Sequence, residues 1–250
     1  MQVHCHSGRI FFKPSTVLAI KRCFQHDVIV VYHEEVFATS PKRMQVTEQR
    51  WTNLCAALGL PPNNDEFARV KSAYSEPHRA YHTLQHLSEC LEKFDWAIAT
   101  ENFPNTVFAE AALWYHDVVY RPTAKDNERR SAEWAVKFLS QFGIGDYDCR
   151  FVASLIMATC HVEEPEETTH QLVVDIDFSI LGAEPARFDE YERQVREEYK
   201  RVPWLVYKKK RKAVLKHFLD KPSIYAVKIF HDAHERQARE NLKRALAKLS

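Results

Sequence analysis

From Thr47 to the C-terminus, apolar residues recur every three to four positions, which is the spacing of one buried face of an α-helix. The first run ends in Gly59-Leu60-Pro61-Pro62, and a glycine followed by prolines is typical of a helix C-terminus. The expected helices lie at about residues 47–58, 64–74, 81–94, 104–120, 127–139, 146–159, 185–200, 203–219 and 223–249. This pattern, in a chain with only 5 glycines, predicts an all-α helical bundle.

The stretch Phe108–Tyr120 (FAEAALWYHDVVY) has no polar face, so we expect its helix to be buried on all sides. It nevertheless carries two adjacent ionisable residues, His116 and Asp117. Burying a carboxylate beside an imidazole costs on the order of several kcal/mol unless a partner such as a metal cation compensates. The His-Asp pairs at residues 26–27 and 231–232 lie outside apolar helices, so only the central pair indicates a site.

Two further stretches carry metal-binding side chains that the fold can bring to the central pair. His82 and His86 are four residues apart on an expected helix, so both project from one face. Asp175 and Asp177 interrupt the apolar stretch LVVDIDFSILG, and we expect one of these carboxylates to point inward. Imidazoles and carboxylates from three helices suit a divalent metal ion (Mn, Fe, Co, Ni, Zn or Mg) rather than a thiolate site.

The composition narrows the class of protein. The 35 basic and 34 acidic residues nearly cancel, which argues against a protein that mainly coats nucleic acid or an anionic membrane. We interpret the basic run at residues 208–212 (KKKRK) as a solvated helix face rather than as a nuclear-localisation or nucleic-acid signal. The chain has no membrane-length apolar run, no signal-peptide core and no Cys-x-x-Cys motif. We expect a cytoplasmic protein with reduced thiols and no membrane partner, and the oligomeric state stays open.

Residues 1–43 differ from the rest of the chain. Short β-prone pieces such as Asp27–Tyr32 (DVIVVY) lie among His, Cys and Lys residues without a helical period, and no later segment offers strands to pair with them. We interpret residues 1–43 as a poorly packed extension upstream of a natural start at Met44, and the alternative is a small docked hairpin. Residues 44–250 are expected to form one domain.

Four motifs, in this order along the chain, resemble the HD-domain superfamily of predicted metal-dependent phosphohydrolases. They are YHTLQH at residues 81–86, WYHDVVY at 114–120, DNE at 126–128 and DIDFSILG at 175–182. The resemblance covers nearly all of residues 44–250 and includes the later stretches at 196–199 and 214–219. It implies an HD-domain-like helical bundle.

The resemblance also implies roles for individual residues. The superfamily's metal-ligand pattern of one His, then His-Asp, then a distant Asp falls on His86, His116, Asp117 and Asp177. Either His82 or His86 fits the first position. In the distantly similar cyclic-nucleotide phosphodiesterases, the second His of such a pair binds metal and the first donates a proton to the leaving oxygen. By this similarity, His86 is the metal ligand and His82 is the acid catalyst.

Four other residues are candidates near this site. Glu128 either holds a metal-bound water, orients His82 or only favours its helix dipole as a first-turn acid. Arg79 either contacts a phosphate of the substrate or forms a structural ion pair. His161 is a candidate additional member of the site, and Asp175 is expected to be a cap or an acceptor behind the ligands.

These residues lead to a hypothesis about function. The resemblance implies a metal-dependent phosphoric ester hydrolase that uses metal-activated water on a small phosphomonoester, with a nucleotide as the expected substrate. One alternative is a phosphodiesterase. A second alternative is a catalytically inactive, metal-containing module that binds a nucleotide or a protein partner.

Overall fold

The computed structural model describes residues 45–160 and 164–249, and every regular element in these ranges is helical. The elements are α1 Glu48–Ala57, α2 Asn64–Ala73, α3 Leu84–Thr100, α4 Thr106–Tyr115, α5 Asn127–Gln141, α6 Asp146–Ala158, α7 Thr168–Phe178, the 3-10 helix η1 Ser179–Gly182, α8 Pro185–Glu198, α9 Trp204–Asp220 and α10 Lys228–Lys248. The expected all-α class is therefore confirmed for the part of the chain that the structure describes.

The chain divides between Arg43 and Met44, and all of the helices above belong to the unit Met44–Ser250. The expected poor packing of residues 1–43 concerns positions outside the described residues. None of the helices in the described ranges combines the length and the apolar character needed to cross a membrane. Four of the six cysteines fall in these ranges, and all four are free thiols.

Helix α4 forms the centre of the bundle and contacts α1, α3, α5, α6 and α7. Six of its ten residues are at most 1% exposed, as its uniformly apolar sequence predicts. Trp114 on α4 packs edge-to-face against Trp51 on α1, with ring centroids 5.2 Å apart. The helix ends at Tyr115, five residues before the expected end, so His116 and Asp117 lie in the turn that follows a rigid, buried element.

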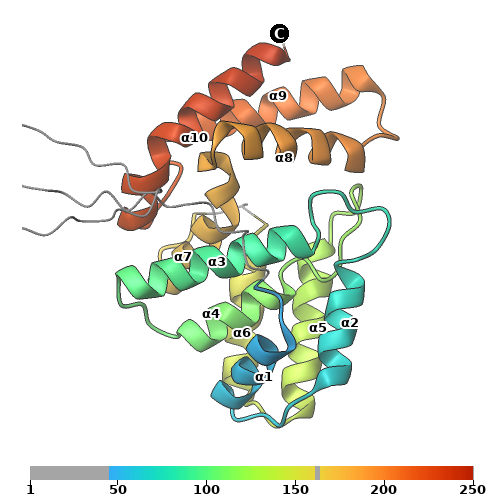
Figure 1. The fold of residues 1–250 in the computed structure, drawn as a ribbon, viewed down its shortest axis with the longest axis vertical. Coiled ribbons are helices and arrows are strands. Elements are labelled where there is room, and N and C mark those ends of the chain that lie inside the picture. The colour runs from blue at the N-terminus through green and yellow to red at the C-terminus, as the bar shows by residue number, and fades with distance from the viewer. Residues whose placement is uncertain (1–44, 161–163, 250) are drawn as a thin grey trace, which may run out of the picture. The chain divides into compact units, whose positions relative to one another are not determined.

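Helix α7 and η1 connect the two ends of the domain. Figure 1 shows α1 to α6 gathered at one end and α8, α9 and α10 at the other, with α7 between them. Helix α7 contacts α3, α4 and α6, whereas η1 contacts α8 and α10. Residues on or near α7 and η1 can therefore contact residues from both ends of the domain.

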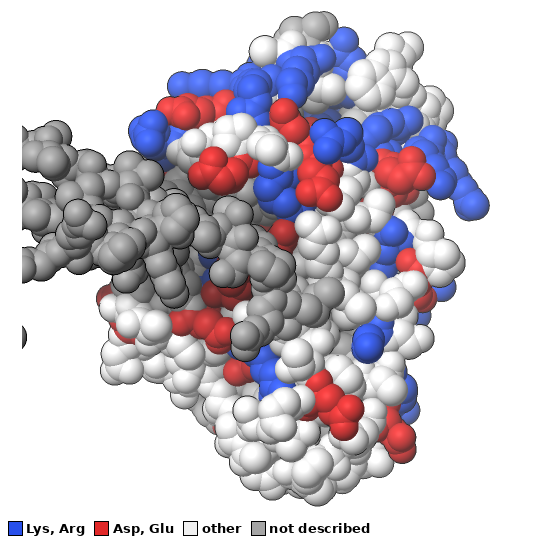
Figure 2. Space-filling model, in the orientation of Figure 1, with Lys and Arg blue, Asp and Glu red and all other residues white. Residues whose placement is uncertain are grey.

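The basic run on α9 only partly matches the expected solvated face. Lys209 and Lys210 are exposed, and Figure 2 shows basic side chains gathered over the end of the domain that α8, α9 and α10 form. Arg211 is instead buried, where its guanidinium donates to the carboxylate of Glu192 and to the Tyr191 hydroxyl at 2.9 Å. A buried guanidinium requires such partners, so Arg211 serves the α8–α9 contact.

Asp175, on α7, fixes the start of α10 and occupies the capping role left open for it. It is 1% exposed, and its carboxylate accepts hydrogen bonds from the backbone N–H groups of Ala226 at 3.2 Å and Val227 at 2.6 Å. Val227 is the N-cap residue of α10 and Ala226 precedes it, so the carboxylate anchors the backbone at the point where the helix begins. Burial raises the pKa of Asp175 to about 7, although the two N–H groups act in the opposite direction.

Asp175→Ala should lower the free energy of unfolding by about 1–3 kcal/mol, because two backbone N–H groups, one of them buried, would lose their acceptor. For a chain of this size the midpoint of thermal unfolding should fall by roughly 2–4 °C per kcal/mol. Thermal unfolding measured by circular dichroism checks this, with Asp232→Ala as the control because Asp232 is 56% exposed on α10. Equal midpoints for the two variants would show that the cap contributes no stability.

Candidate metal centre

Four of the expected site residues bring their polar atoms to one point, at the ends of α3, α4 and α7. His86 Nε2 lies 3.0 Å from His116 Nε2 and 3.2 Å from Asp177 Oδ1. Asp117 Oδ2 lies 3.4 Å from His86 Nε2 and 3.2 Å from His116 Nε2. Donor atoms that share one ion at about 2.0–2.2 Å stand about 2.8–3.6 Å apart when they are neighbours in octahedral or tetrahedral arrangements. The four distances above fall in this range, and the fifth, from His116 Nε2 to Asp177 Oδ1, is longer at 3.8 Å. This spacing is close to that of atoms around a single small cation.

The two kinds of side chain differ in their access to solvent. The imidazoles of His86 and His116 are 2% and 1% exposed, whereas the carboxylates of Asp117 and Asp177 are 14% and 18% exposed. The imidazoles thus form the inner wall of the cluster, and the carboxylates lie at its open side. A small molecule would reach the cluster from the carboxylate side.

His116 is held in the tautomer that a metal ligand needs. Its Nδ1 lies 2.8 Å from the backbone carbonyl of Leu113, and a carbonyl oxygen only accepts, so Nδ1 carries the proton of the neutral ring. The Nε2 lone pair then faces His86 and the carboxylates. The Leu113 carbonyl has no helical partner because the N–H of Asp117 donates to the Tyr74 hydroxyl at 3.2 Å. Such a second hydrogen bond is the usual way of orienting a metal-binding histidine.

The charges in the cluster favour a cation at its centre. Burial acts to lower the pKa of His116, but Asp117 and Asp177 outweigh it and raise the pKa. Burial acts to raise the pKa of Asp117, but the histidines around it outweigh this effect and hold the pKa well below its usual range. The carboxylate therefore stays ionised, and positive charge on the neighbouring groups is stabilised. A divalent cation supplies that charge directly.

Cys90 is a member of this cluster that the sequence analysis missed. Its ligand atom and those of His86, His116 and Asp177 all lie within 4.8 Å of one another, and the group can hold a metal ion. Cys90 Sγ lies 3.7 Å from both ring nitrogens of His86, so the sulfur sits beside the ring. Burial raises the pKa of the Cys90 thiol, which keeps it protonated. The four-residue spacing that paired His82 with His86 also pairs His86 with Cys90 and was the available signal.

His82 precedes α3 and does not lie on the helix, which corrects the expectation that His82 and His86 share one helical face. The helix begins at Leu84, because the hydroxyl of Thr83 accepts from the N–H of Gln85 at 3.3 Å as the N-cap. The two imidazole rings are nevertheless close, with centroids 5.9 Å apart. The side chain of His82 is 21% exposed, so it reaches the surface near the cluster.

Glu198, at the end of α8, holds His82 in place. One carboxylate oxygen accepts from the backbone N–H groups of Ala80, Tyr81 and His82 at 2.9, 2.8 and 3.0 Å. The other oxygen lies 2.8 Å from His82 Nδ1 and accepts from the Tyr120 hydroxyl at 2.9 Å. The Tyr120 ring stacks on the His82 ring with centroids 3.8 Å apart. Glu198 therefore fixes both the backbone turn and the ring of His82.

Glu198 should make the stability of the domain depend on pH in the acid range. Burial acts to raise its pKa, but His82 and the backbone N–H groups outweigh burial and lower the pKa to about 2 from the usual 4.5. The stabilisation is complete above pH 4.5 and is lost as the pH falls toward 2, in total about 3 kcal/mol. Between pH 5 and pH 3, the stability advantage of the wild type over Glu198→Gln should therefore shrink.

Urea unfolding at pH 5, 4 and 3 measures this advantage directly. Glu197→Gln is the matched control, because Glu197 is the preceding residue and its side chain is 59% exposed. The stability difference between the wild type and this control should stay constant with pH. A constant difference for Glu198→Gln as well would mean that its carboxylate is not stabilised in the folded state.

Arg79 has a structural role instead of the phosphate contact considered from the sequence. Its side chain is 0% exposed, so the guanidinium has no access to a substrate. It donates to the backbone carbonyls of His82 at 3.0 Å, Asp117 at 2.7 Å and Val118 at 3.0 Å, and to the carboxylate of Glu76 at 3.2 Å. Arg79 thus joins the turn of His82 to the turn of Asp117.

Glu128, which was expected to hold water or orient His82, is not the carboxylate that meets His82. That partner is Glu198. Glu128 lies beside Cys160, where burial together with the Glu128 carboxylate raises the pKa of the thiol to about 11. The candidate His161 lies outside the described residues.

Comparisons of the chain with protein-family models, with curated proteins and with solved structures found no significant match. The description of the site therefore rests on the positions of its side chains. The side chains form a buried cluster of His, Cys and Asp residues that can hold a metal ion, in a helical fold compatible with the HD type.

Proposed function

We propose that this chain is a metal-dependent phosphohydrolase that acts on a small phosphomonoester such as a nucleotide. The proposal rests on one observation: a set of metal-binding side chains and an oriented imidazole lie next to each other. The set is formed by His86, His116, Asp117 and Asp177, and the oriented imidazole is that of His82. The resemblance of the four sequence motifs to the HD-domain superfamily supports the same function.

The four converging side chains would hold a divalent ion. Their donor set of two imidazole nitrogens and carboxylate oxygens suits Mn, Fe, Co, Ni, Zn or Mg. We favour Asp117 over Cys90 as the remaining ligand, because its carboxylate is ionised and lies against both imidazoles. When bound, such an ion lowers the pKa of water and neutralises the phosphate oxygens of a substrate.

His82 would provide the proton for the departing alkoxide. The Glu198 carboxylate lies 2.8 Å from His82 Nδ1 and fixes the position of the ring. Stacking on Tyr120 restricts the ring to one orientation. A positioned acid of this kind contributes typically about 10²–10⁴ in rate. A module that only binds its partner has no need of a fixed proton donor.

The decisive experiment is a screen of metal-loaded protein against nucleotides, sugar phosphates and phosphodiesters. Free phosphate is the readout for monoesters, and for diesters an added phosphatase releases phosphate from the monoester that hydrolysis would leave. Phosphomonoesters should release phosphate with the wild type and with Asp232→Asn, and not with Asp177→Asn. The two variants make the same chemical change, one in the cluster and one at an exposed position on α10. Turnover of diesters alone would favour the phosphodiesterase alternative, and no turnover of any substrate would favour an inactive binding module.

A further inference from the structure

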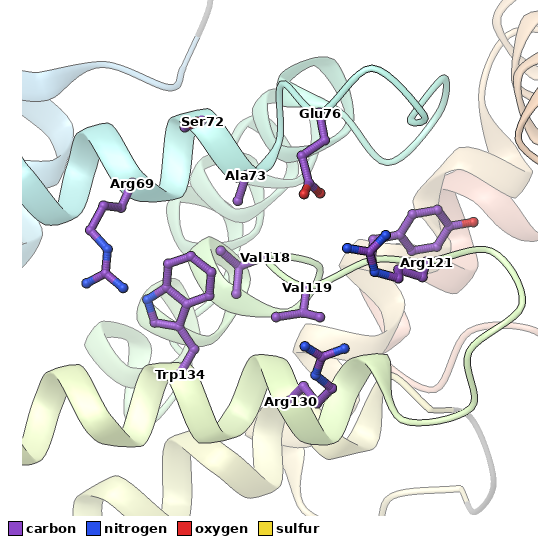
Figure 3. A pocket seen from close by; sticks show the side chains of 10 residues that line it. Arg69, Ser72, Ala73, Glu76, Val118, Val119, Arg121, Arg130 and Trp134 are labelled. Carbon is purple, nitrogen blue, oxygen red and sulfur yellow. The ribbon is translucent and has the colours of Figure 1, made fainter.

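A cavity of about 380 Å³ lies between α2, α5 and the segment that follows α4. Three arginines and one tryptophan face it, namely Arg69, Arg121, Arg130 and Trp134 (Figure 3). The ligand residues and His82 do not line it. It is therefore a different place from the candidate metal centre.

One wall of the cavity is fixed by a buried carboxylate. Glu66 is 3% exposed and accepts hydrogen bonds from Trp134 Nε1 at 2.6 Å and from the Tyr115 hydroxyl at 3.0 Å. It also accepts from Arg69 at 2.7 Å, and the Arg69 guanidinium lies 5.0 Å from the centroid of the Trp134 ring. The charge of Arg69 is thus balanced by Glu66, and this wall is ordered before any ligand arrives.

The opposite side of the cavity carries positive charge that nothing in the described residues balances. The side chains of Arg121 and Arg130 have no hydrogen-bond or ion-pair partner among those residues, and Figure 3 shows both guanidinium groups on the same side of the cavity, next to Val119. The one acidic side chain lining the cavity, Glu76, is engaged by Arg79 at 3.2 Å. Two positive charges therefore remain without a counterion in the part of the chain that the structure describes.

The neighbouring arginine on α5 shows the ordinary alternative. Arg129 pairs with Asp126 at 2.9 Å and with Glu133, and it does not line the cavity. Acidic residues are thus within reach of this part of α5, yet none of the described ones pairs with Arg130. The arginines of the cavity thus differ from Arg129, which forms ordinary surface ion pairs.

We propose that this cavity is a second binding site that takes the phosphate group of a small phosphorylated molecule. Two guanidinium groups match the charge of a phosphate monoester dianion, and guanidinium offers the forked donors that phosphate oxygens accept. A volume of about 380 Å³ lies at the lower end of the range for small-molecule sites. None of the four proposed metal ligands lines the cavity, although Tyr120, which stacks on the His82 ring, does. Phosphate binding by Arg121 and Arg130 can therefore be tested without a metal ion at the cluster.

The binding of inorganic phosphate to the full chain, measured by isothermal titration calorimetry at constant ionic strength, tests this proposal. A chelator in the buffer removes metal, so phosphate cannot bind through an ion at the His/Asp cluster. The wild type should bind phosphate, and the double variant Arg121→Gln/Arg130→Gln should bind at least ~10-fold more weakly, since it lacks both charge-assisted contacts. Both arginines are exposed, so the double variant should fold normally, and Arg130→Gln alone gives the same test with a smaller loss.

Two controls make the result specific. Arg129→Gln removes a neighbouring charge on the same helix, and Asp177→Asn changes the metal cluster, so both variants should bind phosphate as the wild type does. The proposal would be overturned by absence of binding to the wild type, by equal affinity in the double variant, or by loss of binding in Asp177→Asn. An equal loss in Arg129→Gln would also overturn it, since the effect would then be general electrostatics.

Discussion

Asp117→Ala is expected to release the metal ion and abolish hydrolysis. Its carboxylate lies 3.4 Å and 3.2 Å from the two imidazole nitrogens, so its removal leaves the set without the group that joins both histidines. The loss of a group that merely supports a ligand costs about 10- to 100-fold in metal affinity or activity, and the loss of a ligand should exceed this. Elemental analysis of purified protein and phosphate release from the best substrate measure the two effects.

The same substitution should lower thermal stability when metal is present. An ion that binds only the folded state adds about 2.7 kcal/mol at a free concentration of 100 times its Kd, and Asp117→Ala should lose this addition. The matched control is Asp232→Ala, which breaks the exposed His231-Asp232 pair on α10. Metal content in Asp117→Ala equal to that of the wild type would show that Asp117 is not a ligand.

His82→Ala and His86→Ala are expected to fail in different ways. His86→Ala should lose metal and activity together, because its Nε2 lies within 3.4 Å of three other ligand atoms. His82→Ala should keep its metal, since the ring of His82 pairs with Glu198 and not with the cluster. Its turnover should fall by about 10² or more on substrates with a poor alkoxide leaving group.

The leaving group separates acid catalysis by His82 from a general disturbance of the site. An activated aryl phosphate departs without a proton, so His82→Ala should lose much less on that substrate than on an alkyl phosphate. The ratio of the two rates, measured for wild type and variant at equal metal content, is the readout. An equal rate loss on both substrates, or metal loss in His82→Ala, would exclude the acid role.

The ligand cluster could be predicted from the sequence because ionisable residues stand there in a stretch that is otherwise apolar. The pair His116-Asp117 ends a helix that has no polar face, whereas His231-Asp232 lies in a polar helix and is exposed in the structure. The 3.6-residue period located the α-helices except α7, whose apolar sequence has no helical stripe, and N-terminal signals placed most starts within a few residues. These features are local, and local patterns are what a single sequence displays.

The surroundings of His82 could not be predicted, because they depend on contacts between residues far apart in the chain. Glu198 lies 116 residues beyond His82 and comes from the opposite end of the domain, so no spacing rule could pair them. Its four hydrogen bonds to this segment also explain why the chain near His82 forms a turn and not the expected helix. The two alternatives for Arg79 could not be separated from the sequence for a related reason, because two of the carbonyls that it contacts belong to a distant turn.

The most direct measurement of the metal centre is anomalous X-ray scattering from a crystal of the full chain grown with Mn²⁺, Zn²⁺ or Ni²⁺. We expect one peak among the side chains of His86, His116, Asp117 and Asp177, at about 2.0–2.3 Å from their nearest nitrogen and oxygen atoms. His82 should lie outside this coordination distance. An ion bound elsewhere, or none at these four side chains in metal-saturated protein, would contradict the assignment on which the proposed hydrolysis depends.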